Sequence, residues 1–166
     1  MNQLASAKLG IMGWELIIVL FLIGGEFLLG LMLGKNRIFL MLLGAYISSA
    51  LLSVIPVKKM FPDFFGKEEN FVVMIVSFLV LIGIVYIIFS KSVLKSKSRT
   101  QSIFQTFFYG LFLVGIILTM VFSFLPEDLI SQLSDLTLKI FNTSLARILW
   151  FVMPLVFIWI FKKNGK

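Results

Sequence analysis

The stretch that decides the fold is residues 14–37, WELIIVLFLIGGEFLLGLMLGKNR. It is apolar over most of its length, and a helix that crosses a bilayer needs about 20 such residues. Two acids interrupt the apolar run, Glu15 near its start and Glu26 in its middle, and two basic residues close it. The stretch therefore predicts a membrane helix whose acids need a physical explanation.

The whole chain shares this apolar character. Of its 166 residues, 60% are hydrophobic, and the mean hydropathy is +1.06. A soluble domain of this length cannot bury so much apolar surface, so the composition indicates a membrane protein. The chain has no cysteine and no histidine, which excludes a disulfide framework, a thiolate metal site and the commonest general base. Because the basic residues lie in loops, the net charge of +7 favours a topological role over nucleic-acid binding.

Five apolar stretches follow one another along the chain. The second ends at Pro56 and the fourth at Pro126, where proline interrupts the helical hydrogen bonds. We expect an all-α fold, a polytopic transmembrane helical bundle of about five spans that forms a single integral membrane domain over residues 1–166. The expected spans are residues 14–33, 38–55, 71–89, 103–125 and 145–161.

The segment between the fourth and fifth spans, PEDLISQLSDLTLKIFNTSLA, has a different pattern. Glu127 and Asp128 come directly after a proline, where acids stabilise the positive end of a helix dipole. Large aliphatic residues then recur at steps of four, three and four, at Leu129, Leu133, Leu136 and Ile140. This pattern predicts one amphipathic interfacial helix over residues 127–141, lying on the membrane surface.

The distribution of charge predicts the orientation in the membrane. With five spans, residues 35–37, residues 91–99 and the C-terminal tail share one side, which carries nine positive residues and no acid. The other side carries six positive and six negative residues. Positive residues concentrate on the cytoplasmic side of membrane proteins. We therefore expect a multi-pass protein of the cell inner membrane with its N-terminus outside and its C-terminus in the cytoplasm.

Glu26 is the sharpest candidate for a functional residue. A charged side chain at the centre of a membrane helix costs about 2.5–3.5 kcal/mol on insertion scales. Glu15 lies 11 residues earlier, about three helical turns, so the two acids share a face. This face could form a proton or cation path, or a neutral Glu26 could hydrogen-bond to a serine of the second span. The candidate intramembrane polar site comprises Glu26, Glu15, Ser48 and Ser49, with Ser53 as a further partner.

Two other sets of residues are candidate contact sites. The glycines of the first span predict close helix packing, within the chain or in a dimer, and a pair of them could instead mark a helix break. They are Gly24, Gly25, Gly30 and Gly34. The basic linker after the third span is a candidate contact for anionic lipid heads, or a solvated topological determinant. Its basic residues are Lys91, Lys95, Lys97 and Arg99.

The sequence contains none of the common catalytic or nucleotide-binding motifs. A P-loop, a dinucleotide-binding glycine pattern, H-E-x-x-H and G-x-S-x-G are all missing. We therefore expect no catalytic, cofactor-binding or metal site and no enzymatic activity. The expected partners are the lipid bilayer and either further copies of the chain or other membrane proteins, with no nucleic acid.

The order of these features resembles the colicin V production protein (CvpA) family of small bacterial inner-membrane proteins. The resemblance covers roughly residues 14–140 and includes a short basic turn, GKNR, and a second span rich in small residues, LLGAYISSALLSVIP. It continues through a basic linker to the proline-terminated exit FSFLPEDLISQLS. The glycine of the turn precedes its basic residues instead of following them, and residues 145–161 add a span to the family's usual four.

The resemblance implies a non-enzymatic accessory role in envelope maintenance, toxin production or export. The alternative is a small ion- or proton-coupled transporter or channel subunit that uses Glu26. A pore former of the holin type fits less well, because the outside loop and the surface helix are elaborate for a simple lesion.

Overall fold

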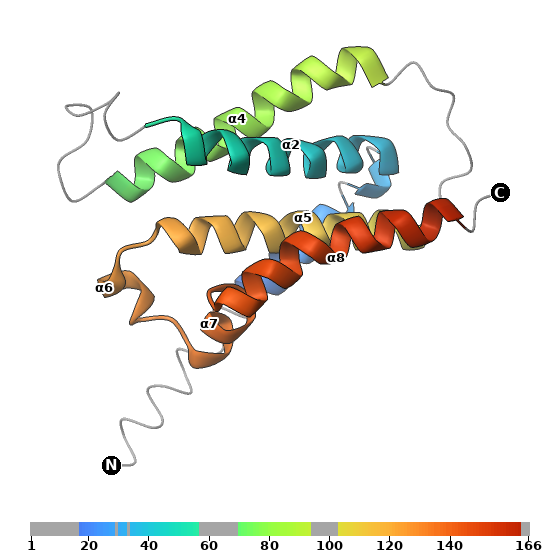
Figure 1. The fold of residues 1–166 in the computed structure, drawn as a ribbon. Coiled ribbons are helices and arrows are strands. Elements are labelled where there is room, and N and C mark those ends of the chain that lie inside the picture. The colour runs from blue at the N-terminus through green and yellow to red at the C-terminus, as the bar shows by residue number, and fades with distance from the viewer. Residues whose placement is uncertain (1–16, 29, 33, 57–69, 94–102, 164–166) are drawn as a thin grey trace. The chain divides into compact units, whose positions relative to one another are not determined.

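All secondary structure in the described part of the chain is helical. The computed structural model describes residues 17–28, 30–32, 34–56, 70–93 and 103–163. A first helix covers Ile17–Met32. It is followed by α2 (Lys35–Val54), α4 (Asn70–Val93), α5 (Ile103–Phe124), α6 (Glu127–Ile130), α7 (Asp135–Phe141) and α8 (Ser144–Lys163) (Figure 1). The expected all-α fold is confirmed.

Four of these helices, α2, α4, α5 and α8, are long and apolar enough to cross a membrane. They correspond within a few residues to the second to fifth expected spans, and they define the chain as a helical membrane protein. The Ile17–Met32 helix is apolar but shorter. At 1.5 Å per residue it is roughly 24 Å long, against about 30 Å for the hydrocarbon core. The beginning of the first expected span, residues 14–16, lies outside the described residues.

The connection between the first helix and α2 differs from the expected basic loop. Helix α2 already begins at Lys35, so residues 35–37 form its first turn. Gly34 precedes it with a φ of 84°, a backbone conformation that a side chain would strain. The amide of Gly34 donates to the carbonyl of Gly30 (2.8 Å), and the amide of Arg37 donates to the carbonyl of Gly34 (3.1 Å). One glycine thus ends one helix and starts the next.

The chain divides into two compact units, Phe27–Leu113 and Met1–Glu26 together with Val114–Lys166. In the first unit, α2 and α4 pack as an antiparallel pair (Figure 1). The small side of α2 lies against the backbone of α4, because a Cβ atom added at Gly44 would be in van der Waals contact with the carbonyl oxygen of Ile82 (3.4 Å). Ala45 and Ser48 on the same helix are fully buried. Small residues therefore form the packed side of α2, as small residues do in other membrane helices.

In the second unit, the segment after Pro126 corrects the expectation of one amphipathic helix over residues 127–141. It forms two short helices, α6 and α7, separated by four residues. Ser134 ends the interruption, because its hydroxyl caps α7 by accepting a hydrogen bond from the Thr137 amide (3.3 Å). A serine followed by an acid is a helix-start signal, and it prevails here over the spacing of the leucines.

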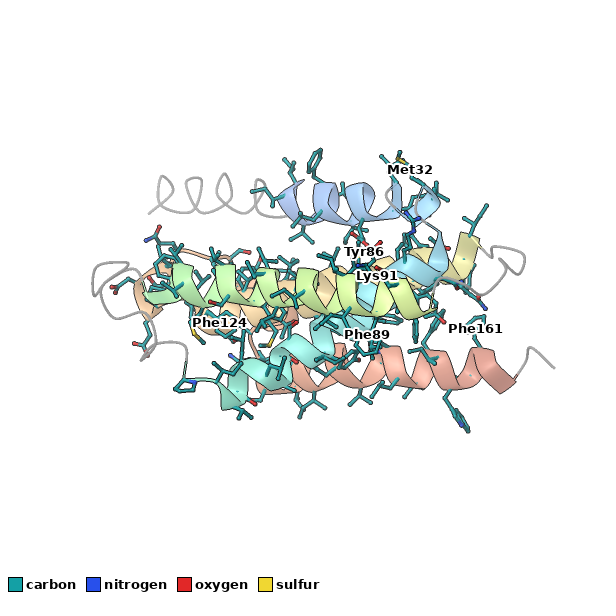
Figure 2. All side chains as sticks on the ribbon, turned by 90° about the horizontal axis from the view of Figure 1, so that it is seen from above. Met32, Tyr86, Phe89, Lys91, Phe124 and Phe161 are labelled. Carbon is teal, nitrogen blue, oxygen red and sulfur yellow. The ribbon has the colours of Figure 1, made fainter. Side chains whose placement is uncertain are left out.

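Apolar side chains remain exposed along the long helices. Most of the surface of α4 and α8 is open and aliphatic or aromatic. Met32, at the end of the first helix, is 82% exposed and points outward (Figure 2). In a membrane protein these surfaces meet lipid or other membrane helices, so their exposure is the expected arrangement.

Candidate functional site

Glu26 lies on the Ile17–Met32 helix and is half-buried. Its Oε1 atom is fully buried and has no hydrogen-bond partner among the described residues. A buried polar atom without a partner costs free energy, and more so in a membrane helix. Within the described residues, this atom of Glu26 therefore lacks the hydrogen bond that would offset its burial.

The serine hydroxyls of α2 differ in their hydrogen bonds. The Ser49 hydroxyl donates to the carbonyl of Tyr46 (2.8 Å), and the Ser53 hydroxyl donates to the carbonyl of Ala50 (2.6 Å). The Ser48 hydroxyl is buried and has no partner within the described ranges. Glu26 and these serines belong to different compact units, so the expected hydrogen bond between them stays a prediction.

Most of the other charged residues of the expected sites lie outside the described residues, and Lys91 is the exception in the basic linker. Glu15 and the linker residues Lys95, Lys97 and Arg99 are outside the described ranges. Lys91 is exposed in the last turn of α4, where a cation suits the negative end of the helix dipole. Its contact with lipid heads stays a prediction.

The four glycines of the first stretch occupy different environments. A Cβ atom added at Gly24 or Gly25 would meet nothing within 4 Å among the described residues. At Gly30 it would collide with the Ile38 side chain and lie 2.7 Å from Cγ2 of Thr106. Gly30 thus permits a close approach of helices, whereas Gly34 is needed for its backbone conformation.

A further close helix contact lies at Gly115, outside the candidate packing glycines of the first stretch. A Cβ atom added at Gly115 of α5 would overlap the indole ring of Trp150 in α8. The Trp150 ring also stacks on Phe141 of α7, with ring centroids 5.5 Å apart and planes 8° apart. The sequence signal is Gly115-x-x-x-Thr119, a small-residue pair at helical spacing. The contact orders α5, α7 and α8 around one aromatic side chain.

The described residues offer a carboxyl group and hydroxyl groups, but no cluster for metal binding. No group of three or more histidine, cysteine, aspartate or glutamate side chains comes together in the described part of the chain. Chemically, Glu26 can bind a proton or share a hydrogen bond, while Ser48 and Thr119 add buried hydroxyls, one in each unit.

No protein-family model, curated protein or solved structure matches this chain. The four long apolar helices by themselves define the class, a helical, multi-pass membrane protein. Its resemblance to the CvpA family stays a prediction from the order of its sequence features.

Proposed function

We propose that this chain is a non-enzymatic inner-membrane protein of the CvpA kind, an accessory to envelope maintenance, toxin production or export. The observation that carries the proposal is the order of its elements. A glycine turn at Gly34 leads into α2, whose packed side is built from small residues. Pro126 then leads from the long α5 into short helices. The accessory role acts through contacts with lipid and with other membrane proteins, for which α4 and α8 offer open apolar surface.

The proposed orientation has the N-terminus outside and the C-terminus in the cytoplasm. Two exposed cations of the first unit support it, Arg37 in the first turn of α2 and Lys91 in the last turn of α4. Because α2 and α4 are antiparallel, these turns lie at the same end of the pair (Figure 1). A shared positive end is typical of the cytoplasmic side.

Deletion of the gene in its host tests the accessory role. We expect the deletion to make cells more sensitive to detergent and chelator, with rescue by the wild-type chain. Rescue by Glu26→Gln should be equally complete, because an accessory that works through surface contacts does not need a titrating carboxyl. An unchanged envelope in the deletion strain would refute the proposal.

A second function is favoured by one specific observation, the buried Oε1 of Glu26, which has no hydrogen-bond partner in the described part of the chain. An ionisable group inside a membrane commonly marks a proton or ion path. If this chain transports, purified protein in proteoliposomes should dissipate an imposed pH gradient, and Glu26→Gln should slow that flux at least tenfold. Wild-type vesicles that are no leakier than empty vesicles would exclude proton transport. The serines of α2 are candidate partners of Glu26, so their variants are a poor control. Met32→Gln, at an exposed site of the helix that carries Glu26, serves instead.

A further inference from the structure

Helix α7 presents three separate sides. Successive residues of an α-helix are about 100° apart, so residues four apart share a side. Thr137 and Phe141 form a side that is buried against the protein, with exposed fractions of 2% and 5%. Asp135 and Lys139 form an exposed polar side. Leu136 and Ile140 form the third side, which is apolar and yet 42% and 40% exposed.

The rotation of α7 about its own axis is fixed by contacts with α8. The indole nitrogen of Trp150 donates a hydrogen bond to the carbonyl oxygen of Ile140 (2.9 Å). The ring of Trp150 stacks on Phe141, which also meets Phe122 of α5 edge-on at 5.8 Å. These contacts hold the buried side inward, so Leu136 and Ile140 are held facing outward.

The C-terminal end of α7 is tied to the first turn of α8. Thr143 joins the two helices, because its hydroxyl donates to the carbonyl of Lys139 (3.1 Å) and accepts from the amide of Ala146 (3.2 Å). Helix α8 is a candidate membrane span, and its first turns expose Leu145 (75%) and Ile148 (58%). Leu136 and Ile140 thus lie next to the end of a lipid-facing helix.

We propose that α7 inserts its exposed apolar side into the lipid bilayer beside the start of α8. Leu136 and Ile140 enter the boundary between headgroups and acyl chains, while Asp135 and Lys139 face water and headgroups. A phospholipid bilayer fits this surface better than a specific protein partner, because two aliphatic side chains cover far less than the roughly 800 Å² that each partner of a stable interface buries. Apolar burial at the membrane boundary is the usual way in which such helices bind. This insertion of α7 sets the depth at which α8 enters the bilayer, whatever the function of the whole chain.

The absence of cysteine in the sequence makes a direct test possible, because an introduced cysteine is the only thiol. Leu136→Cys and Ile140→Cys are compared with the matched controls Asp135→Cys and Lys139→Cys, each spin-labelled in the full chain. The chain is reconstituted into phosphatidylcholine–phosphatidylglycerol vesicles. Collision with oxygen, which concentrates in lipid, is measured against collision with a water-soluble nickel chelate.

We expect the ratio of oxygen to nickel collisions to be several-fold higher at positions 136 and 140 than at 135 and 139. Two outcomes would overturn the proposal. Equal nickel access at all four positions would place α7 in water. Protection of 136 and 140 from both reagents would mean that protein, such as a second copy of the chain, covers this side. Each labelled variant is first required to elute as the unmodified chain does, and either apolar position alone decides the result.

Discussion

Gly115 shows most clearly how one residue controls the packing of this protein. It has no side chain, and the Trp150 ring occupies the space where a Cβ atom would lie. Trp150 in turn holds α7 by two contacts, its stacking on Phe141 and its hydrogen bond to Ile140. A single methyl group at position 115 therefore disturbs three helices.

The substitution Gly115→Ala tests this contact. The added methyl group must displace a ring that is held by stacking and a hydrogen bond, so we expect a loss of about 1–3 kcal/mol, typical of overpacking. The measurement is the thermal unfolding of purified protein in detergent. Gly83→Ala is the matched control, because a Cβ atom there meets nothing within 4 Å among the described residues. Equal melting temperatures for the two variants would contradict the packing role of Gly115.

The sequence identifies residues that could pack but not the partners that they meet. Gly24, Gly25 and Gly30 are the same residue type on the same helix. In the described part of the chain, however, only at Gly30 would an added Cβ atom contact other side chains. The side of a helix that a neighbour covers depends on tertiary packing, which a single sequence does not encode locally. For the same reason the chemistry of Gly115, unlike that of Glu26, does not indicate its role.

At the scale of elements, the region between α5 and α8 differs most from its prediction. The spacing of Leu129, Leu133, Leu136 and Ile140 fits a single continuous helix. The helix is nevertheless interrupted between Ile130 and Asp135. The Ser134 hydroxyl both caps α7 and lies 2.9 Å from the hydroxyl of Thr137. Local hydrogen bonds of serine compete with helix continuation, and this competition decides the boundary.

Ser134→Ala removes the cap of α7. An N-cap serine stabilises a helix by about 0.5–2 kcal/mol, and a seven-residue helix has little else of its own to hold it. We expect faster amide hydrogen exchange at Leu138 and Ile140. Ser131→Ala is the control, since that exposed hydroxyl donates to the carbonyl of Asp128, within the preceding turn. Unchanged exchange in the Ser134 variant would show that α7 does not depend on its cap.

Trp150→Phe separates the hydrogen bond of Trp150 from its stacking. Phenylalanine keeps an aromatic ring but loses the N–H group that donates to Ile140. We expect a loss of about 1 kcal/mol, the usual net value of one hydrogen bond, with the helix content retained. Chemical unfolding in mixed micelles, followed by circular dichroism, measures this loss. Trp159→Phe is the control at a 67% exposed position of the same helix.

At the scale of the whole molecule, the sequence predicts the fold class and the positions of the four long apolar helices well. Apolar length and proline stops are strong local signals, so the bounds of α2, α4, α5 and α8 agree with expectation within a few residues. The start of α2 is an exception, because Lys35 and Arg37 resemble loop residues although Gly34 alone makes the turn. The candidate polar site remains open because Glu26 and Ser48 lie in different units.

The first stretch also decides the topology. If the Ile17–Met32 helix spans the membrane together with its preceding residues, the chain crosses five times and its ends lie on opposite sides. If it lies on the surface, the four longer helices place both ends on the same side. The basic ends of α2 and α4 share one side of the membrane in both arrangements, so only the location of the N-terminus distinguishes them.

The most direct test of this account is a pair of reporter fusions, one at each end of the full chain. Each fusion carries a fluorescent protein that is active only in the cytoplasm or a phosphatase that is active only outside it. Five spans predict fluorescence at the C-terminus and phosphatase activity at the N-terminus. The same reporter active at both ends would contradict a five-span protein and would place the Ile17–Met32 helix outside the set of spans.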